Sequence, residues 1–156
     1  MSDITLPQED ADALIQMEKR CVGPSSYTFP QPGRTLEIEC QPPDGSERFH
    51  LDIYRGSINL KKVSQNFRAR TSIVLLRLDV DTAPHRNPDG EKIGRTHLHV
   101  YREGYGDSWA YEIPGPLPED VPALRLGDLT DRVRTLRDFM RYCNIVDLPT
   151  INSVLL

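Results

Sequence analysis

Residues 69–80, with the sequence ARTSIVLLRLDV, form the longest segment of the chain that is typical of a β-strand. The centre of this segment, Ile73 to Leu76, consists of four consecutive apolar residues, so both of its faces require cover from water. A strand that is covered on both faces lies in the interior of a sheet. We therefore expect the fold to be organised around this segment.

Shorter segments on either side alternate between apolar and polar residues, which is the period of a strand with one buried face. In RTLEIEC, residues 34–40, Leu36 and Ile38 would share the buried face. Similar strands are predicted at residues 47–54, 96–103 and 108–113. The Asp44–Gly45 step is typical of a β-hairpin turn, so residues 34–40 and 47–54 are predicted to pair as antiparallel neighbours.

Two helices are predicted, one near each end of the chain. Within Thr5–Arg20 apolar residues recur at helical spacing, and Thr5 with Gln8 forms a capping-box pattern. The second helix follows Asp128, its predicted N-cap, and carries an apolar stripe opposite a row of arginines. Strands in the middle and helices at the ends indicate an α+β fold.

We predict a single domain over residues 1–156, with a mostly antiparallel meander sheet of about five to seven strands and helices on one face. No apolar run approaches the ~20 residues of a membrane span, and residues 1–10 lack the basic and apolar regions of a secretory signal. The three cysteines form no close-set pair, which favours reduced thiols over a disulfide framework. We therefore expect a cytoplasmic protein with no membrane partner.

The formal net charge of -4 is unevenly distributed along the chain. Residues 61–102 carry nine basic and four acidic side chains, whereas the segments before and after them are acidic. If the basic side chains share a face, they would attract phosphate groups. If they do not, they are solvated charges of the kind that prevents strands from pairing at a sheet edge.

The basic segment also holds three of the four histidines. His97, His99 and Tyr101 occupy alternate positions of a predicted strand, so they would project together from an accessible face. Their clustering indicates a functional surface.

Other polar residues are expected close to this face. If residues 69–80 form the antiparallel neighbour of the histidine strand, Arg77 and Asp79 would lie beside the two imidazoles. The loop of about 15 residues from Asp81 to Arg95 would bring His85 over the same rim, and a loop of this length is more often functional than a simple hairpin connection.

Two imidazoles that titrate near neutrality can act as a general base and a general acid. On this hypothesis the chain is an RNA-directed, metal-independent endoribonuclease that needs no cofactor, with the 2'-hydroxyl of RNA as the nucleophile. One of His97 and His99 would be the base, and the other, or His85, the acid. The residues predicted to clamp phosphate or stack on a base are Arg77, Arg102, Tyr101, Tyr105 and Trp109.

A separate phosphate site is predicted around the turn at Gly56. Arg55, Asn59 and Lys61 would bind the phosphate oxygens there. A solvated strand face is the alternative interpretation of the same residues.

Three alternatives to the ribonuclease hypothesis stay open. His-x-His on a strand is a common metal-binding geometry, and Glu103 or Asp79 would complete the ligand set. The histidines and aromatic residues could instead only pack beneath a loop or a partner protein. Finally, the acidic first and last segments could bind a basic partner, which would make the chain a non-enzymatic interaction protein.

The run PHRNPDGEKIGRTHLHVYREGYGDSWAYEIP, residues 84–114, resembles a family of small uncharacterised bacterial and phage-borne proteins. The resemblance extends to FHLDIYRGSINLKK, LLRLDVD and DFMRYCNI, and so to most of the chain. It implies no established activity. Such proteins often lie among toxin–antitoxin or phage-conflict genes, so the resemblance implies either an RNA-directed toxin with an antitoxin partner or a factor that inhibits a host or defence complex.

Overall fold

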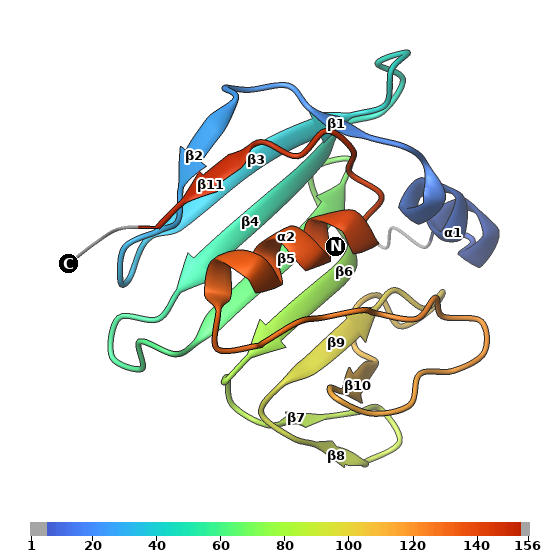
Figure 1. The fold of residues 1–156 in the computed structure, drawn as a ribbon. Helices are drawn as coiled ribbons and strands as arrows, with labels where there is room; N and C mark the ends of the chain where they lie inside the picture. The colour runs from blue at the N-terminus through green and yellow to red at the C-terminus, as the bar shows by residue number, and fades with distance from the viewer. Residues whose placement is uncertain (1–5, 154–156) are drawn as a thin grey trace.

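The computed structural model describes residues 6–153 and confirms the predicted α+β class (Figure 1). Seven strands form one antiparallel sheet in the order β1-β3-β4-β5-β6-β9-β10. Their bounds are β1 Arg20–Cys21, β3 Thr35–Gln41, β4 Phe49–Arg55, β5 Val63–Ala69, β6 Ile73–Val80, β9 His97–Val100 and β10 Ala110–Glu112. The helices are α1, Gln8–Gln16, and α2, Arg132–Tyr142. Neither helix has the length and apolar character that crossing a membrane requires.

Strand β6 has the interior position that its apolar run predicts, between β5 and β9. The pairing of β5 with β6 shifts after Phe67, which lies opposite Leu76, whereas Arg68 lies opposite Val74. Leu75 is therefore an extra residue of a β-bulge, and it is fully buried. The bulge keeps the apolar side chains of β6 in the core on both sides of the shift.

One face of the sheet carries the main core. Leu51 of β4 lies opposite Phe67 of β5, and both side chains are fully buried. Helix α2 lies across the sheet (Figure 1), and its Leu136 and Phe139 belong to the same core. The apolar positions of the predicted alternating pattern thus supply the face that needs cover, because successive side chains of a strand point to opposite faces.

The other face of the sheet is polar. The strand register places Asp52, Asn66, Arg77 and His99 in one row across β4, β5, β6 and β9. A second row contains Tyr54, Ser64, Asp79 and His97. These rows bring side chains from four strands together on one surface, although they are far apart in the sequence.

The helix starts differ from those predicted. Helix α1 begins after Pro7 without a side-chain cap, and Thr5 of the predicted capping box lies outside the described residues. Helix α2 is capped by Asp131, whose side chain accepts a hydrogen bond from the Arg134 N–H, and not by Asp128. The Asp128 carboxylate instead accepts hydrogen bonds from the backbone and hydroxyl of Thr130, which closes a separate turn before the helix.

A buried lysine connects the C-terminal ends of the two helices. The side chain of Lys19 is fully buried, and its Nζ donates hydrogen bonds to the carbonyl oxygens of Ile15, at 2.8 Å, and Cys143, at 2.7 Å. The same Nζ lies 4.9 Å from the centre of the Phe49 ring. Both carbonyls belong to last turns, where a cation is favourable to the helix dipole. Burial lowers the pKa of Lys19 to about 8.

Two small sheets complete the fold. Strands β2, Ser26–Thr28, and β11, Thr150–Asn152, pair in parallel. Strands β7, His85–Arg86, and β8, Lys92–Ile93, pair as an antiparallel hairpin inside the predicted loop. The long connection between β6 and β9 is therefore an ordered hairpin, and it brings His85 to the polar face.

Candidate functional site

The paired histidines lie where β6 and β9 run side by side. Asp79 is opposite His97, and Arg77 is opposite His99, so the predicted neighbourhood of these four residues is confirmed. The expected accessibility is wrong: His97 and His99 are each 1% exposed. The β7–β8 hairpin accounts for part of their cover, because the ring of His85 lies 4.6 Å from that of His99 and 5.7 Å from that of His97, centre to centre.

Three potential metal ligands converge in this cluster. Oδ2 of Asp79 lies 3.2 Å from Nε2 of His97 and 3.3 Å from Nε2 of His99. One ligand atom from each of the three residues lies within 4.8 Å of the other two. Two imidazoles and one carboxylate are a recurrent ligand set for divalent transition metals.

Backbone carbonyl groups fix the orientation of both imidazoles. Nδ1 of His97 is 2.7 Å from the carbonyl oxygen of Gly94, and Nδ1 of His99 is 2.8 Å from that of Asp107. Because a carbonyl oxygen only accepts, each Nδ1 carries the proton that it donates. In the neutral rings, both Nε2 lone pairs therefore face the Asp79 carboxylate. Two lone pairs beside an anion repel it, so the arrangement calls for a cationic group beside them: a proton, a metal ion or, at His99, the guanidinium of Arg77.

The carboxylate of Asp79 is held in its ionised form. Burial raises its pKa. Hydrogen bonds from His97, His99 and Ser64, together with the charge of Arg77, lower the pKa by more than burial raises it. The net result is a pKa well below the ordinary value for aspartate. Those two histidine hydrogen bonds require a proton on each Nε2, and a metal ion bound at the same two atoms would take the place of these protons beside the ionised carboxylate.

Arg77 occupies the side of the cluster that is nearest to solvent. Its Nη2 lies 2.9 Å from Nε2 of His99, and its Nε lies 3.3 Å from Oδ2 of Asp79. A metal ion bound to His99 would compete for the same lone pair. The guanidinium has a second partner in Asp107, 3.2 Å from Nη1, and its side chain is 31% exposed, so it would keep an ion pair at the surface if a metal ion replaced it at His99.

A hollow of about 400 Å³ opens beside the cluster. His99 and Arg77 form part of its wall, so the hollow connects the cluster with solvent. Its other lining residues are His85, Arg86, Pro88, Asp107 and Ser108. By this route a small anionic group could approach His99, whereas His97 does not line the hollow.

The β7–β8 hairpin is attached over the cluster by Asn87. The amide of this buried side chain donates to the carbonyl oxygen of Ala110 and accepts from the Ala110 N–H, both at 2.9 Å. Nε2 of His85 also lies 2.7 Å from the carbonyl oxygen of Ser108. Side chains of the hairpin thus make hydrogen bonds, along the outer side of β10, of the kind that a neighbouring strand would otherwise make.

Asn87→Ala is expected to lower the free energy of opening of this hairpin by about 2 kcal/mol, because it leaves two buried backbone groups of Ala110 without partners. Native-state hydrogen exchange at residues 85–93 measures the change. Asn59→Ala is the matched control, because the Asn59 side chain makes its hydrogen bonds, to the Asp81 carbonyl oxygen and from the Lys61 N–H, at the exposed surface. Equal protection of the hairpin in both variants would contradict the role given to Asn87.

Several predicted site residues lie apart from the cluster. Tyr101 does not share the histidine face: β9 ends at Val100, and the Tyr101 side chain turns into the core, where its hydroxyl bonds to both backbone groups of Leu6. Arg102 forms an ion pair with Asp120. Tyr105 and Trp109 pack edge to face against each other, and neither lines the hollow.

The residues predicted to bind phosphate around Gly56 make contacts elsewhere in the fold, and so does one predicted metal ligand. Arg55 Nη1 lies 3.5 Å from the carbonyl oxygen of Pro30, and Lys61 is exposed in the turn between β4 and β5. Asn59 Nδ2 donates to the carbonyl oxygen of Asp81. Glu103 accepts a hydrogen bond from the Gln8 N–H, so Asp79 is the carboxylate that joins the histidines.

Sequence reasoning missed the groups that act through their backbone. The carbonyl oxygens of Gly94, Asp107 and Ser108 orient the three histidine rings, and no side-chain pattern reveals them. Ser64 was also missed, although its hydroxyl donates to Asp79. Its position in an alternating strand was the available signal, but the pairing register was needed to use it.

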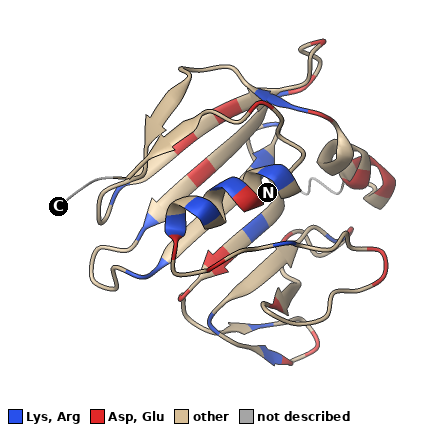
Figure 2. Cartoon of the chain, viewed as in Figure 1, with Lys and Arg blue, Asp and Glu red and all other residues tan. Residues whose placement is uncertain are grey.

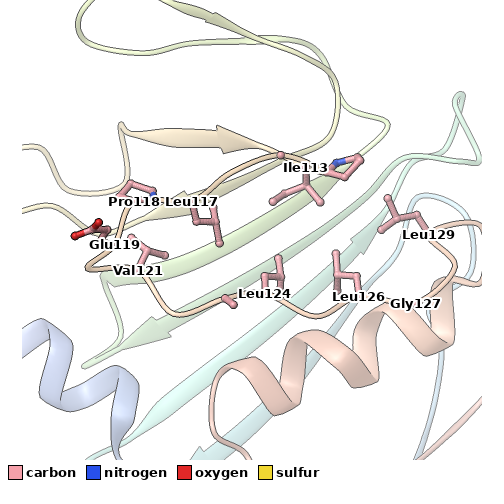
Figure 3. A pocket seen from close by; sticks show the side chains of 12 residues that line it. Ile113, Leu117, Pro118, Glu119, Val121, Leu124, Leu126, Gly127 and Leu129 are labelled. Carbon is pink, nitrogen blue, oxygen red and sulfur yellow. The ribbon is translucent and has the colours of Figure 1, made fainter.

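A larger cavity, of about 640 Å³, lies along residues 113–129, apart from the histidines (Figure 3). Its wall is mostly apolar, with Ile113, Leu117, Val121 and Leu124 among the side chains drawn. Among its described lining residues, Glu119 alone carries a charge. This chemistry does not match the phosphate ligand predicted from the sequence.

Comparison with known proteins places most of the chain in one family model. The model of a family of unknown function, DUF6978, matches residues 6–145. No curated protein and no solved structure matches the chain.

Proposed function

We propose that this chain, which belongs to the DUF6978 family of unknown function, is a metal-dependent enzyme that acts on phosphate esters. RNA is the predicted substrate. The observation that supports this most is the convergence of Asp79, His97 and His99, with both rings oriented by backbone carbonyls. Imidazole and carboxylate ligands suit zinc, iron and manganese. Three protein ligands leave room for water or substrate, which is typical of catalytic rather than structural sites.

The surrounding residues support a phosphate ester as the substrate. A divalent ion in this ligand set would polarise a phosphoryl oxygen and lower the pKa of a bound water. Arg77 and Arg86 line the hollow and can bind the other phosphate oxygens, since guanidinium groups match phosphate geometry. His85 lies in the same wall, where it can give a proton to the leaving oxygen.

The metal-independent scheme has less support from the geometry. A general base and a general acid must reach opposite sides of the scissile phosphate. The rings of His97 and His99 are 4.9 Å apart and those of His85 and His99 are 4.6 Å apart, centre to centre, and both pairs are in edge contact. No phosphate fits between rings in contact. The His97 and His99 rings are also buried.

Metal titration and RNA cleavage test the proposal together. Protein stripped with a chelator is titrated with Co²⁺, whose visible absorption reports imidazole coordination, and with Zn²⁺ and Mn²⁺ by calorimetry. We expect one ion per chain and cleavage of single-stranded RNA only after metal is restored. His97→Ala and His99→Ala should lose both properties.

His50→Ala is the matched control, because His50 lies on the same polar face but outside the cluster. It should bind metal and cleave RNA as the wild type does. Folded wild-type protein that takes up no stoichiometric metal would overturn the metal centre. Cleavage that continues in chelator would favour the acid–base scheme instead.

The non-enzymatic alternative makes a different prediction. If acidic surfaces bind a basic partner, charge reversal at Glu9 and Asp10 of α1 should weaken binding, and alanine at His97 should not. Figure 2 shows that basic residues recur along the ribbon of α2, so the last segment is not uniformly acidic. The toxin-like setting, with an antitoxin or defence-complex partner, stays a prediction of the resemblance.

A further inference from the structure

Two cysteines face each other at the end of the sheet that is farthest from the histidines. Cys21 of β1 lies directly opposite Cys40 of β3, and their sulfur atoms are 3.6 Å apart. The third cysteine, Cys143, is fully buried near the end of α2. The proposed function uses none of these thiols.

The strand register makes this pair suitable for a covalent link. The Val22 N–H donates to the carbonyl oxygen of Glu39, so Val22 and Glu39 form a hydrogen-bonded pair of the antiparallel ladder. The adjacent pair, Cys21 and Cys40, is then a non-hydrogen-bonded pair, whose Cα atoms lie about 4.5 Å apart. That separation is within the range of disulfides, about 4.4 to 6.8 Å, so the bond requires side-chain rotation but no shift of the strands.

The two thiols differ in access to solvent. Cys21 is partly exposed, next to Val22, which is 44% exposed, whereas Cys40 is fully buried. The hydrogen bond between the thiols lowers the pKa of Cys21, although burial opposes this effect. Cys21 is therefore the thiol that a small oxidant reaches first, and Cys40 is the thiol placed to react with the product.

We propose that Cys21 and Cys40 form a redox pair that a hydroperoxide oxidises to a disulfide. The Cys21 thiolate attacks one peroxide oxygen, the O–O bond breaks, and Cys21 becomes a sulfenic acid while hydroxide or alkoxide leaves. The Cys40 sulfur then attacks the Cys21 sulfur, the S–O bond breaks, and water leaves with the Cys40 proton. Both sulfurs are oxidised, and the peroxide is reduced to water or to water and an alcohol.

The experiment uses the full chain, reduced and then exposed to hydrogen peroxide. Samples are unfolded in an alkylating reagent and weighed intact by mass spectrometry. The wild type has three cysteines, and we expect oxidation to leave Cys143 as the one alkylated residue, with the mass of two hydrogen atoms lost. Peptide mapping should show Cys21 joined to Cys40.

Three variants make the result specific. Cys143→Ala should still form the disulfide, and Cys21→Ser should keep both remaining thiols. Cys40→Ser should stop at the sulfenic acid, which a sulfenic-acid reagent labels at Cys21. The proposal fails if the wild type retains three alkylated cysteines under peroxide, or if Cys21 is oxidised to sulfinic acid without any loss of Cys40.

Discussion

Replacing Asp79 with alanine is expected to lower the affinity of the protein for Co²⁺ or Zn²⁺ by more than about 100-fold, the upper range for loss of a group that only supports a ligand. Asp79 is the anionic member of the cluster, and its Oδ2 lies within 3.3 Å of Nε2 of both His97 and His99. Without it, two neutral imidazoles face the ion without charge compensation. Competition with a chromophoric chelator measures the affinity.

Asp52→Ala provides the control for the loss of a carboxylate from the same face. Asp52 of β4 is ion-paired with Arg68, and β5 and β6 separate β4 from β9, so its removal should leave the metal affinity unchanged. Asp79→Asn, which keeps the size of the side chain, separates loss of charge from loss of packing. If Asp79→Asn is folded by circular dichroism and binds metal as tightly as the wild type, Asp79 is not a ligand.

Lys19→Met is expected to lower the free energy of unfolding by about 2 kcal/mol at pH 7, because the carbonyls of Ile15 and Cys143 lose their buried donor. The loss should grow with pH. Burial lowers the pKa of Lys19 to about 8 in the folded protein, from 10.5 in the unfolded chain. Between these values the unfolded chain binds more protons, so the wild type gains stability as the pH rises, and neutral lysine keeps both hydrogen bonds.

The stability difference between wild type and Lys19→Met should therefore widen by about 2.5 kcal/mol from pH 7 to pH 10. Chemical denaturation at each pH measures it, and taking the difference cancels the titration of groups that both proteins share. Lys92→Met is the control, because Lys92 is exposed on β8. A difference that stays constant with pH would show that folding does not lower the pKa of Lys19.

Residue periodicity predicted the strands of the sheet, because the spacing of apolar residues along a strand depends only on which of its faces are buried. The apolar run at Ile73–Leu76 required an interior strand, and the alternation in residues 34–40 and 47–54 required one buried face. The neighbourhood of Arg77 and His99 followed from assuming antiparallel pairing, which the register confirms. The strands of the candidate site could be predicted to this extent.

Periodicity could not predict what lies over a face. His97 and His99 alternate with apolar residues as solvent-facing residues do, but the β7–β8 hairpin lies beside them. Tyr101 follows the last residue of β9, where alternation no longer applies. Both errors concern contacts between segments that are far apart in the sequence. The alternation of residues along one segment does not indicate such contacts.

Asn87 has a consequence for the solubility of the protein. Strand β10 is the last strand of the sheet, and the amide of Asn87 occupies the N–H and carbonyl of Ala110 on its outer side. Backbone groups at the edge of a sheet that lack a partner are a template on which another chain can add a strand. By satisfying them from within the same molecule, one side chain blocks intermolecular strand addition, and with it a common route to aggregation.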